Sequence, residues 1–358
     1  MPPAAAPLVS TILPSHNHVR FIDDAVESVL NQGIDALELI VVDDASSDGT
    51  PDRVARQDDA RIRLIRLDDN RRRHARNDGI AVATGKYIAF QNSDDVWIQG
   101  KLRKQLDVLE RDPSIVACFT ATQIIDEDGV ELRESWARQA TDAGQQSSAA
   151  WLRRFFEAGN SLCISSAVVR HDALRTVGRF KPSLTQLGDL DCWVRLAAIG
   201  GFHVLDEALV QMRVTGRNLS APGAATSRRA AFEFIDVLGR YAERPLLGRL
   251  PQVFADIWPS RALSDECQLG RLALLAWTRS PAHVLFGTQL MSRLLDDDGH
   301  REALVEVFGV DIIHTFIAKR GELGLLSHAP AGHGPSAAAY LGRVLRDGLG
   351  GLRRGRLC

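Results

Sequence analysis

Residues 85–97, with the sequence GKYIAFQNSDDVW, decide the fold. The apolar run from Tyr87 to Phe90 is long enough for one buried strand. Asp94 and Asp95 follow it, and two adjacent carboxylates at the end of a buried strand are unfavourable unless their charge is compensated. One interpretation is a divalent cation with oxygen ligands, which can also hold phosphates. The other is a solvated turn before an N-capped helix.

The bulk composition is that of an ordinary globular protein. The chain has 358 residues, 45% hydrophobic and 25% charged, enough for one large domain or two moderate ones. A net charge of −2 gives no basic field that would favour nucleic acid. The cysteines are scattered without metal-ligand spacing, and no apolar run approaches the roughly 20 residues that cross a bilayer. We therefore expect a cytoplasmic protein, with peripheral contact at the inner face of the membrane left open.

The chain divides by composition into three parts. Residues 1–7 are rich in Pro and Ala, lack the features of a secretory signal, and are expected to form a disordered lead. Residues 8–223 carry alternating strand and helix patterns. Residues 224–358 show only helical patterns and are expected to form a helical domain or extension, for which homo-oligomerisation is one open role. Its Arg-bearing end is a solvated tail or a contact for acidic lipid.

Unbroken apolar runs alternate with amphipathic helical patterns in the first 90 residues. The expected strands are 8–13, 37–42, 62–67 and 87–90, and the expected helices are 21–30, one opening at Thr50, and 75–83. This alternation predicts an α/β fold with a mostly parallel, Rossmann-like sheet flanked by helices. Polar turns follow three of the strands, at 14–17, 43–50 and 92–95. Because ligands bind at the carboxyl ends of such strands, we expect these turns to share one functional edge.

The rest of the chain has a looser pattern. We expect, in order, a helix at 101–111, a strand at 115–120, a hairpin turn at 126–129, a mobile loop at 134–150, a strand at 162–169, a helix at 189–199, strands at 202–205 and 208–214, and helices at 227–242, 283–296, 299–308 and 336–347.

Five short segments occur along the chain in the same order as in a known protein family. They are VSTILPSHN at 9–17, VVDDASSDGT at 41–50, ARNDGI at 75–80, ATGKYIAF at 83–90 continuing into NSDD, and GDLDCWVRL at 188–196. Each is weak alone, but together, over residues 8 to about 220, they resemble the inverting family 2 glycosyltransferases, which use the GT-A nucleotide-sugar fold. The C-terminal third carries no such resemblance.

The resemblance implies a nucleotide site. The base would lie over Pro14, Ser15, His16 and Asn17, where His16 stands in place of a usual Tyr and either stacks on the base or is a solvated side chain. Asp44 would accept the imide N–H of uracil or thymine, or it caps its own turn. An arginine of the 71–76 group, with Arg76 as our candidate, would close over the nucleotide.

The resemblance also implies a metal site. Asp94 and Asp95 match the family's acidic pair, so Mn²⁺ or Mg²⁺ would bridge them to the diphosphate and stabilise the leaving group. We expect Asp95 to reach the metal and Asp94 to contact the ribose or sugar, although the opposite order is open. Asn92 is a departure, because many relatives carry Asp there.

The catalytic base implied by the resemblance is Asp189. Inversion is a single displacement, so one carboxylate must take the proton of the acceptor hydroxyl. The alternative is that Asp189 only caps its helix, and Asp191 is the rival base. Gly188 departs from the usual Glu.

Three further residues are candidates for acceptor or diphosphate contacts. Trp193 shapes the acceptor subsite or belongs to the core. Arg213 and Arg217 fall where relatives fold a loop over the diphosphate, so either would neutralise phosphate charge.

The predicted function is transfer of one sugar from a UDP-sugar to a saccharide or lipid-linked saccharide in surface-glycan assembly. A nucleotidyltransferase or a dinucleotide oxidoreductase would carry Gly-rich motifs after the first strand, and these are missing. Processive synthases of the family carry membrane helices and a Gln-x-x-Arg-Trp segment, which are also missing. The alternative is a catalytically degenerate scaffold that binds a partner, supported only by His16, Asn92 and Gly188.

Overall fold

The computed structural model describes residues 6–70, 74–135, 137, 144–216, 218–260 and 262–322. The predicted helix at 336–347, most of the predicted lead and part of the predicted loop at 134–150 lie outside these residues. The chain forms two compact units, and the boundary between them along the chain falls between Ala230 and Ala231.

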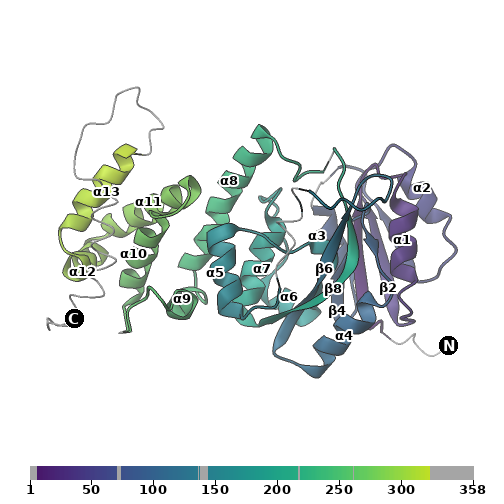
Figure 1. The fold of residues 1–358 in the computed structure, drawn as a ribbon, viewed down its shortest axis with the longest axis horizontal. Coiled ribbons are helices and arrows are strands. Elements are labelled where there is room, and N and C mark those ends of the chain that lie inside the picture. The colour runs from purple at the N-terminus through teal and green to yellow at the C-terminus, as the bar shows by residue number, and fades with distance from the viewer. Residues whose placement is uncertain are drawn as a thin grey trace. The chain divides into compact units, whose positions relative to one another are not determined.

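The first unit is built on an eight-stranded sheet with the order β3-β2-β1-β4-β7-β6-β8-β5 (Figure 1). The strands are β1 (Val9–Ser15), β2 (Leu37–Asp43), β3 (Ile62–Arg66), β4 (Tyr87–Phe90), β5 (Val96–Trp97), β6 (Ile115–Ile125), β7 (Val168–Arg170) and β8 (Gly201–Arg213). The four strands of the first 90 residues are parallel, as predicted. Beyond them β7 runs antiparallel between β4 and β6, so the sheet is mixed.

Helices cover both faces of this sheet. They are α1 (Ile22–Leu30), α2 (Thr50–Ala55), α3 (His74–Val82), α4 (Lys101–Arg111), α5 (Ser148–Ala158), α6 (His171–Val177) and α7 (Gly188–Ile199). On one face, α1 and α4 bury apolar side chains against β1, β2 and β4. On the other, α3 lies so close that a Cβ at Gly79 would come within 2.7 Å of Ile12 Cγ2. Strands β1 and β4 are buried on both sides, which explains why their residues are mostly apolar, with Ser10 and Thr11 of β1 as buried exceptions.

Three sequence expectations for the first unit were wrong. The predicted strand at 162–169 is instead a short 3₁₀ turn, Ile164–Ser166, followed by the brief β7. The two predicted strands at 202–205 and 208–214 are one strand, β8, which pairs with β6 through an irregular register. The predicted loop at 134–150 is shorter, because α5 begins at Ser148 with its Ser147 side chain as the N-cap.

The second unit is helical in its described part. Its helices are α9 (Leu250–Val253), α10 (Asp265–Ala276), α11 (Pro281–Leu295), α12 (Asp298–Phe308) and α13 (Asp311–Glu322), while α8 (Ala224–Gly239) spans the boundary between the units. Helix α10 had no prediction, because it is buried on nearly every side and its buried positions include the polar Gln268 and Arg271, so the sequence lacks a clear helical period. A membrane crossing needs a long and strongly apolar helix, and the described residues contain none.

Candidate active site

The polar turns after β1, β2 and β4 meet at one edge of the sheet, as predicted. The Asp44 N–H donates to the Ser15 carbonyl at 2.8 Å, and His16 Nδ1 lies 2.8 Å from the Asp44 carbonyl. His18 Nδ1 lies 2.7 Å from Ser93 Oγ, which joins the first turn to the third. Hydrogen bonds therefore join the first turn to both of the others.

The exposed ring of His16 is held on both of its nitrogens. Its Nε2 faces the amide Nδ2 atoms of Asn17 and Asn70 at 3.1 and 3.0 Å. Since those amide groups donate, Nε2 accepts, and Nδ1 carries the proton that is donated to the Asp44 carbonyl. This network sets the tautomer and leaves the exposed ring with a defined orientation in the turn.

Asp43 and Asp44 close β2 in different ways. Both are buried, and Asp43 Oδ2 accepts from the Ser46 N–H at 3.0 Å. Asp43 therefore caps the start of this turn, while the base-binding and turn-capping interpretations of Asp44 both stay predictions. In the neighbouring turn Pro14 is partly exposed, and Ser15 Oγ has no hydrogen-bond partner within the described part of the chain.

Asp95 is the buried member of the acidic pair after β4. It is 1% exposed, and its carboxylate accepts from Ser165 Oγ at 2.5 Å, Asn92 Nδ2 at 3.1 Å and the Arg213 backbone N–H at 2.9 Å. Burial, followed by the nearby charge of Asp94, raises the pKa of the Asp95 carboxyl. Neutral donors therefore orient this carboxylate without balancing its charge.

Asp94 is the partly exposed member of the pair. Within the described part of the chain, its Oδ2 accepts from the Asn218 side chain, whose Nδ2 lies at 3.5 Å. Burial raises the pKa of Asp94, and the Arg213 guanidinium opposes that shift. Because few protein groups contact its oxygens, Asp94 keeps acceptor capacity for a cation. No group of three or more His, Cys, Asp or Glu side chains gathers among the described residues, so such a cation would need further oxygen ligands from a substrate.

Arg76 reaches the acidic pair through Asn92. It is 7% exposed, its guanidinium lies 5.2 Å from the centre of the Phe180 ring, and Nη2 donates to Asn92 Oδ1 at 3.3 Å. Asn92 in turn donates to Asp95 through Nδ2. An Asp at this position could accept from Arg76 but could not donate to Asp95, which gives the departure at Asn92 a structural use. Residues 71–73 lie outside the described residues.

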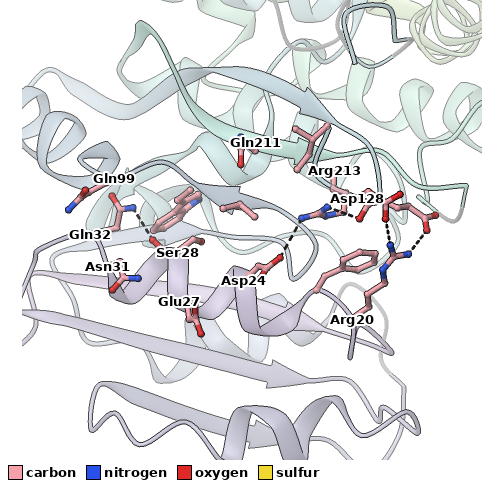
Figure 2. Close-up of a pocket in the computed structure, with 16 residues that line it drawn as sticks. Arg20, Asp24, Glu27, Ser28, Asn31, Gln32, Gln99, Asp128, Gln211 and Arg213 are labelled. Atoms are coloured by element: carbon pink, nitrogen blue, oxygen red, sulfur yellow. Dashed lines mark hydrogen bonds and ion pairs between the residues drawn. The ribbon is translucent and has the colours of Figure 1, made fainter. Parts of the chain in front are cut away.

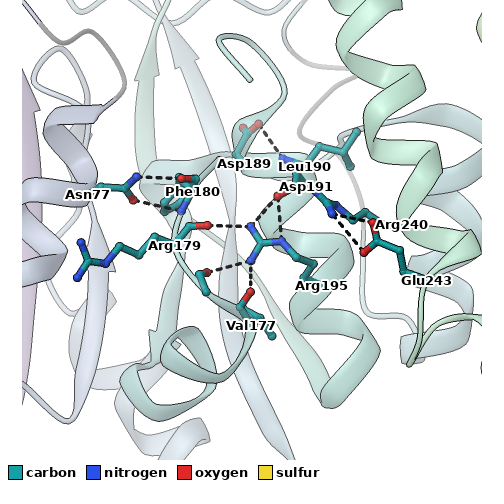
Figure 3. Close-up of polar contacts among 11 residues, drawn as sticks. Asn77, Val177, Arg179, Phe180, Asp189, Leu190, Asp191, Arg195, Arg240 and Glu243 are labelled. Carbon is teal, nitrogen blue, oxygen red and sulfur yellow. Dashed lines mark hydrogen bonds and ion pairs between the residues drawn. The ribbon is translucent and has the colours of Figure 1, made fainter. Parts of the chain in front are cut away.

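Asp189 lies in the first turn of α7 and is partly exposed (Figure 3). Its Oδ2 accepts from Asn160 Nδ2 at 2.9 Å, and its Oδ1 accepts from the Leu190 N–H at 2.8 Å. The N-cap residue of the helix is Leu187, and Asp189 lies two residues later, where its carboxylate accepts from one N–H of the first turn. Its role as catalytic base stays a prediction beside the capping alternative.

Asp191 and Trp193 face the interior instead. Asp191 is fully buried, and its Oδ2 accepts from Arg195 Nε at 2.9 Å and Nη2 at 2.6 Å (Figure 3). Arg195 also donates to the carbonyls of 177–179, so the ion pair holds the segment between α6 and α7. Trp193 is fully buried, with its ring centre 5.1 Å from that of Phe119. The core interpretation of Trp193 is the one that this burial favours.

The guanidinium of Arg213 is occupied by main-chain carbonyls. It donates from Nε to the Asp94 carbonyl at 2.9 Å, and from Nη1 to those of Asp126 and Glu127 at 3.1 and 2.9 Å. With the side chain only 5% exposed, this arrangement disfavours the predicted contact with diphosphate. Arg217 lies outside the described residues.

A polar groove adjoins Arg213, with a volume of about 840 Å³ (Figure 2). It runs along α1 beside β5, β8 and the 126–129 turn. Carboxylates and amides of Asp24, Glu27, Asn31 and Gln99 line it. The Arg213 side chain therefore separates this groove from the acidic pair.

Sequence reasoning missed Ser165, Asn160 and the Asn77–Phe180 contact. Asn77 Oδ1 accepts from the Phe180 N–H at 3.1 Å, and Nδ2 donates to the Phe180 carbonyl at 2.9 Å (Figure 3). The signal for Asn77 was its place in the segment 75–80. For Ser165 the expected strand concealed the 3₁₀ turn that presents its hydroxyl to Asp95.

Known proteins resemble this chain in sequence and in fold. A family model described as Glycosyl transferase family 2 matches residues 10–176. TuaG of Bacillus subtilis strain 168, whose name assigns it to teichuronic acid biosynthesis as a glycosyltransferase, is 30% identical over 245 residues, which cover 64% of this chain and 88% of TuaG. WfgD of Escherichia coli, named a UDP-Glc:alpha-D-GlcNAc-diphosphoundecaprenol beta-1,3-glucosyltransferase, is 41% identical over 103 residues, which cover 28% of this chain and 41% of WfgD.

A solved structure shares the fold. The mannosyltransferase PcManGT of Pyrobaculum calidifontis, solved with GDP-Man and Mn²⁺, superposes with a TM-score of 0.52 and 19% identity, over 90% of this chain and 88% of that one. The match to TuaG covers most of that protein, and the fold and the acidic pair after β4 agree with it. The chain belongs to glycosyltransferase family 2 and is a glycosyltransferase with a GT-A type fold.

Proposed function

We propose that the enzyme transfers one sugar from a nucleotide-diphosphate donor, a UDP-sugar, to a hydroxyl of a saccharide or lipid-linked saccharide, with inversion at the anomeric carbon. The name of WfgD supports the donor and acceptor classes, since it specifies UDP-Glc and a diphosphoundecaprenol-linked GlcNAc. The name of TuaG supports a role in surface-glycan assembly.

The observation that carries this proposal is the geometry of Asp189. Its carboxylate is partly exposed at the start of α7 and is oriented by Asn160. In a single displacement the acceptor oxygen forms the new bond to the anomeric carbon while the bond to the diphosphate breaks, and the hydroxyl proton passes to the base. One carboxylate is enough for this step. Asp191 is a poor rival because its carboxylate is buried against Arg195.

The acidic pair would hold a divalent cation, Mn²⁺ or Mg²⁺. We assign the direct contact to Asp94, because Asp95 is buried and already accepts three hydrogen bonds. The cation would supply positive charge to the departing diphosphate. The mannosyltransferase with the shared fold was solved with Mn²⁺, which supports this choice of metal.

The nucleotide side of the site would consist of the turn at 14–17, Asp44 and Arg76. Asp44 would accept the imide N–H of the base, and the oriented ring of His16 would stack against it. Arg76 would act next to the acidic pair, where its guanidinium already contacts Asn92.

Location and assembly follow as proposals of their own. A cytoplasmic enzyme that contacts the inner membrane face would meet both a nucleotide-sugar and a lipid-linked acceptor. Residues 224–358 would supply a homo-oligomeric contact or a membrane contact. Light scattering of a shortened chain ending near Ala224 tests the first role, because an unchanged number of chains per particle would exclude it.

Calorimetric titration tests the site. UDP is titrated with and without Mn²⁺ into the intact protein and into Asp94→Ala, with GDP and dTDP as competing bases. We expect Mn²⁺-dependent UDP binding that Asp94→Ala abolishes, followed by turnover with a donor panel and a product of inverted anomeric configuration by NMR. Binding without turnover of any donor would favour the scaffold instead.

A further inference from the structure

Arg213, the last residue of β8, connects three segments that are distant in sequence. Its Nε and Nη1 donate to carbonyls of Asp94 and of the 126–129 turn. Its guanidinium lies 4.9 Å from the centre of the Phe21 ring, and Nη2 is 3.8 Å from Asp24 Oδ2 on α1 (Figure 2). The side chain is 5% exposed, so these contacts define a single, fixed position.

We propose that Arg213 is a positioning residue that holds the acidic pair and the 126–129 turn as one rigid unit. It does not touch substrate in this role. Its backbone N–H fixes the carboxylate of Asp95, and its side chain fixes the carbonyl of Asp94. The peptide that carries both carboxylates is therefore restrained on each side, and the affinity for cation and diphosphate depends on that restraint.

Only an arginine can make this set of contacts. The planar guanidinium directs several N–H groups at fixed angles, so it can donate to Asp94, Asp126 and Glu127 together. A lysine at 213 keeps the charge but has a single ammonium centre, which cannot span these carbonyls. The backbone bond to Asp95 survives either way. Substitution of the side chain therefore tests the restraint on Asp94 without removing the donor to Asp95.

The inference rests on the proposed nucleotide and metal site. The test is the dissociation constant of UDP in Arg213→Lys, measured by calorimetry with and without Mn²⁺. We expect about a tenfold weaker affinity with Mn²⁺, as the loss of hydrogen bonds from a charged donor implies, and little change without it. If Arg213 served only the stability of the fold, Arg213→Lys would weaken UDP binding equally with and without Mn²⁺.

Arg170→Lys is the matched control. Arg170 also donates to three main-chain carbonyls, those of Leu109, Asp112 and Ile115, but it pairs with Tyr87 at the opposite end of β4. We expect a comparable loss of thermal stability and unchanged UDP affinity. If Arg213→Lys and the wild type bound UDP with equal affinity in the presence of Mn²⁺, the inference would be overturned while the proposed function would stand. Failure of the wild type to bind UDP, GDP or dTDP would overturn the proposed function as well.

A measurement on the wild type covers the case in which Arg213→Lys does not fold. Hydrogen exchange is followed with and without Mn²⁺ and UDP. If Arg213 joins the segments, the ligands slow exchange at 92–95 and also in the turn, where the Val130 N–H donates to Asp126 Oδ1. Slower exchange at 92–95 with no change at 126–130 contradicts the coupling.

Discussion

The molecule contains two pairs of carboxylates, Asp94 with Asp95 after β4 and Asp189 with Asp191 in α7, and both pairs divide their roles in the same way. One member of each pair is buried and held by several donors, namely Asp95 and Asp191. The other member is partly exposed and contacts one side-chain amide, from Asn218 or Asn160. In both places, the accessible carboxylate is the one suited to chemistry.

The pairs differ in their counter-charge. Asp191 shares its burial with the Arg195 guanidinium, whereas Asp95 meets only neutral donors in the described part of the chain. A buried carboxylate with no cation is unfavourable, which the raised pKa of Asp95 expresses. Among the described residues, the buried carboxylate of the α7 pair therefore has a side-chain cation as its partner, and that of the pair after β4 does not.

The largest expected effect comes from the exposed member of the α7 pair. We expect Asp189→Asn to lower kcat by about a thousandfold, because general base catalysis contributes ~10²–10⁴-fold. UDP affinity should stay within about twofold, since the change leaves the nucleotide turns intact. Steady-state kinetics and calorimetry measure the two quantities. Activity near that of the wild type would remove Asp189 as the base.

The buried members sharpen the contrast in stability. Asp191→Asn leaves the Arg195 guanidinium buried without its carboxylate, so we expect a loss of about 3 kcal/mol in the free energy of unfolding. Asp95→Asn leaves no buried cation without a partner, so we expect the free energy of unfolding to fall by only about 1 kcal/mol in the absence of metal. Urea denaturation at neutral pH compares the two variants. If the two variants lost equal free energies of unfolding, the presence of the Arg195 counter-charge would not explain the difference between the two pairs.

Lys101 extends the comparison to a buried cation. It is fully buried in α4, its Nζ lies 3.9 Å from the centre of the Trp97 ring and has no hydrogen-bond partner among the described residues, and burial lowers its pKa to about 7. Since the unfolded pKa is higher, the cost of burying the charge is full below pH 7 and disappears as pH rises toward the unfolded value. We expect Lys101→Met to gain about 2 kcal/mol at pH 6 and progressively less up to pH 10.

Urea denaturation as a function of pH measures that gain. The conservative variant Lys101→Arg serves as the control, because its charge stays on across the range. If the gain in the free energy of unfolding of Lys101→Met did not change with pH, the prediction that Lys101 is a buried amine with a lowered pKa would be contradicted.

The smallest effect is expected at the amide that orients Asp189. Asn160→Ala should lower kcat about tenfold, as loss of one orienting hydrogen bond implies, with UDP affinity unchanged. Ser161→Ala is the control, because Ser161 lies next to Asn160 in the same loop and its hydroxyl accepts from Arg154. If both variants lost the same activity, the effect would belong to the loop rather than to Asn160.

Much of the first half of the fold could be predicted from the sequence. Strands β1, β2 and β4 are mostly apolar runs bounded by polar turns, a pattern typical of interior strands of a parallel sheet. The segment 164–166 could not be predicted, because its apolar neighbours are equally compatible with a strand. Packing against β4 and β6 decides that it turns and presents Ser165 to Asp95.

The sequence alone determined where the carboxylates lie along the chain, since strand ends and helix starts follow from local patterns. It could not determine which carboxylate of each pair is accessible. Asp94 and Asp95 are identical side chains one residue apart, and Asp189 and Asp191 lie within one helical turn. Burial depends on what each side chain packs against. Ser165 and Arg213 come from segments distant in sequence and meet Asp95 only when the chain has folded. Arg195 lies one helical turn from Asp191, but the carbonyls of 177–179 that hold it beside Asp191 also belong to the folded chain.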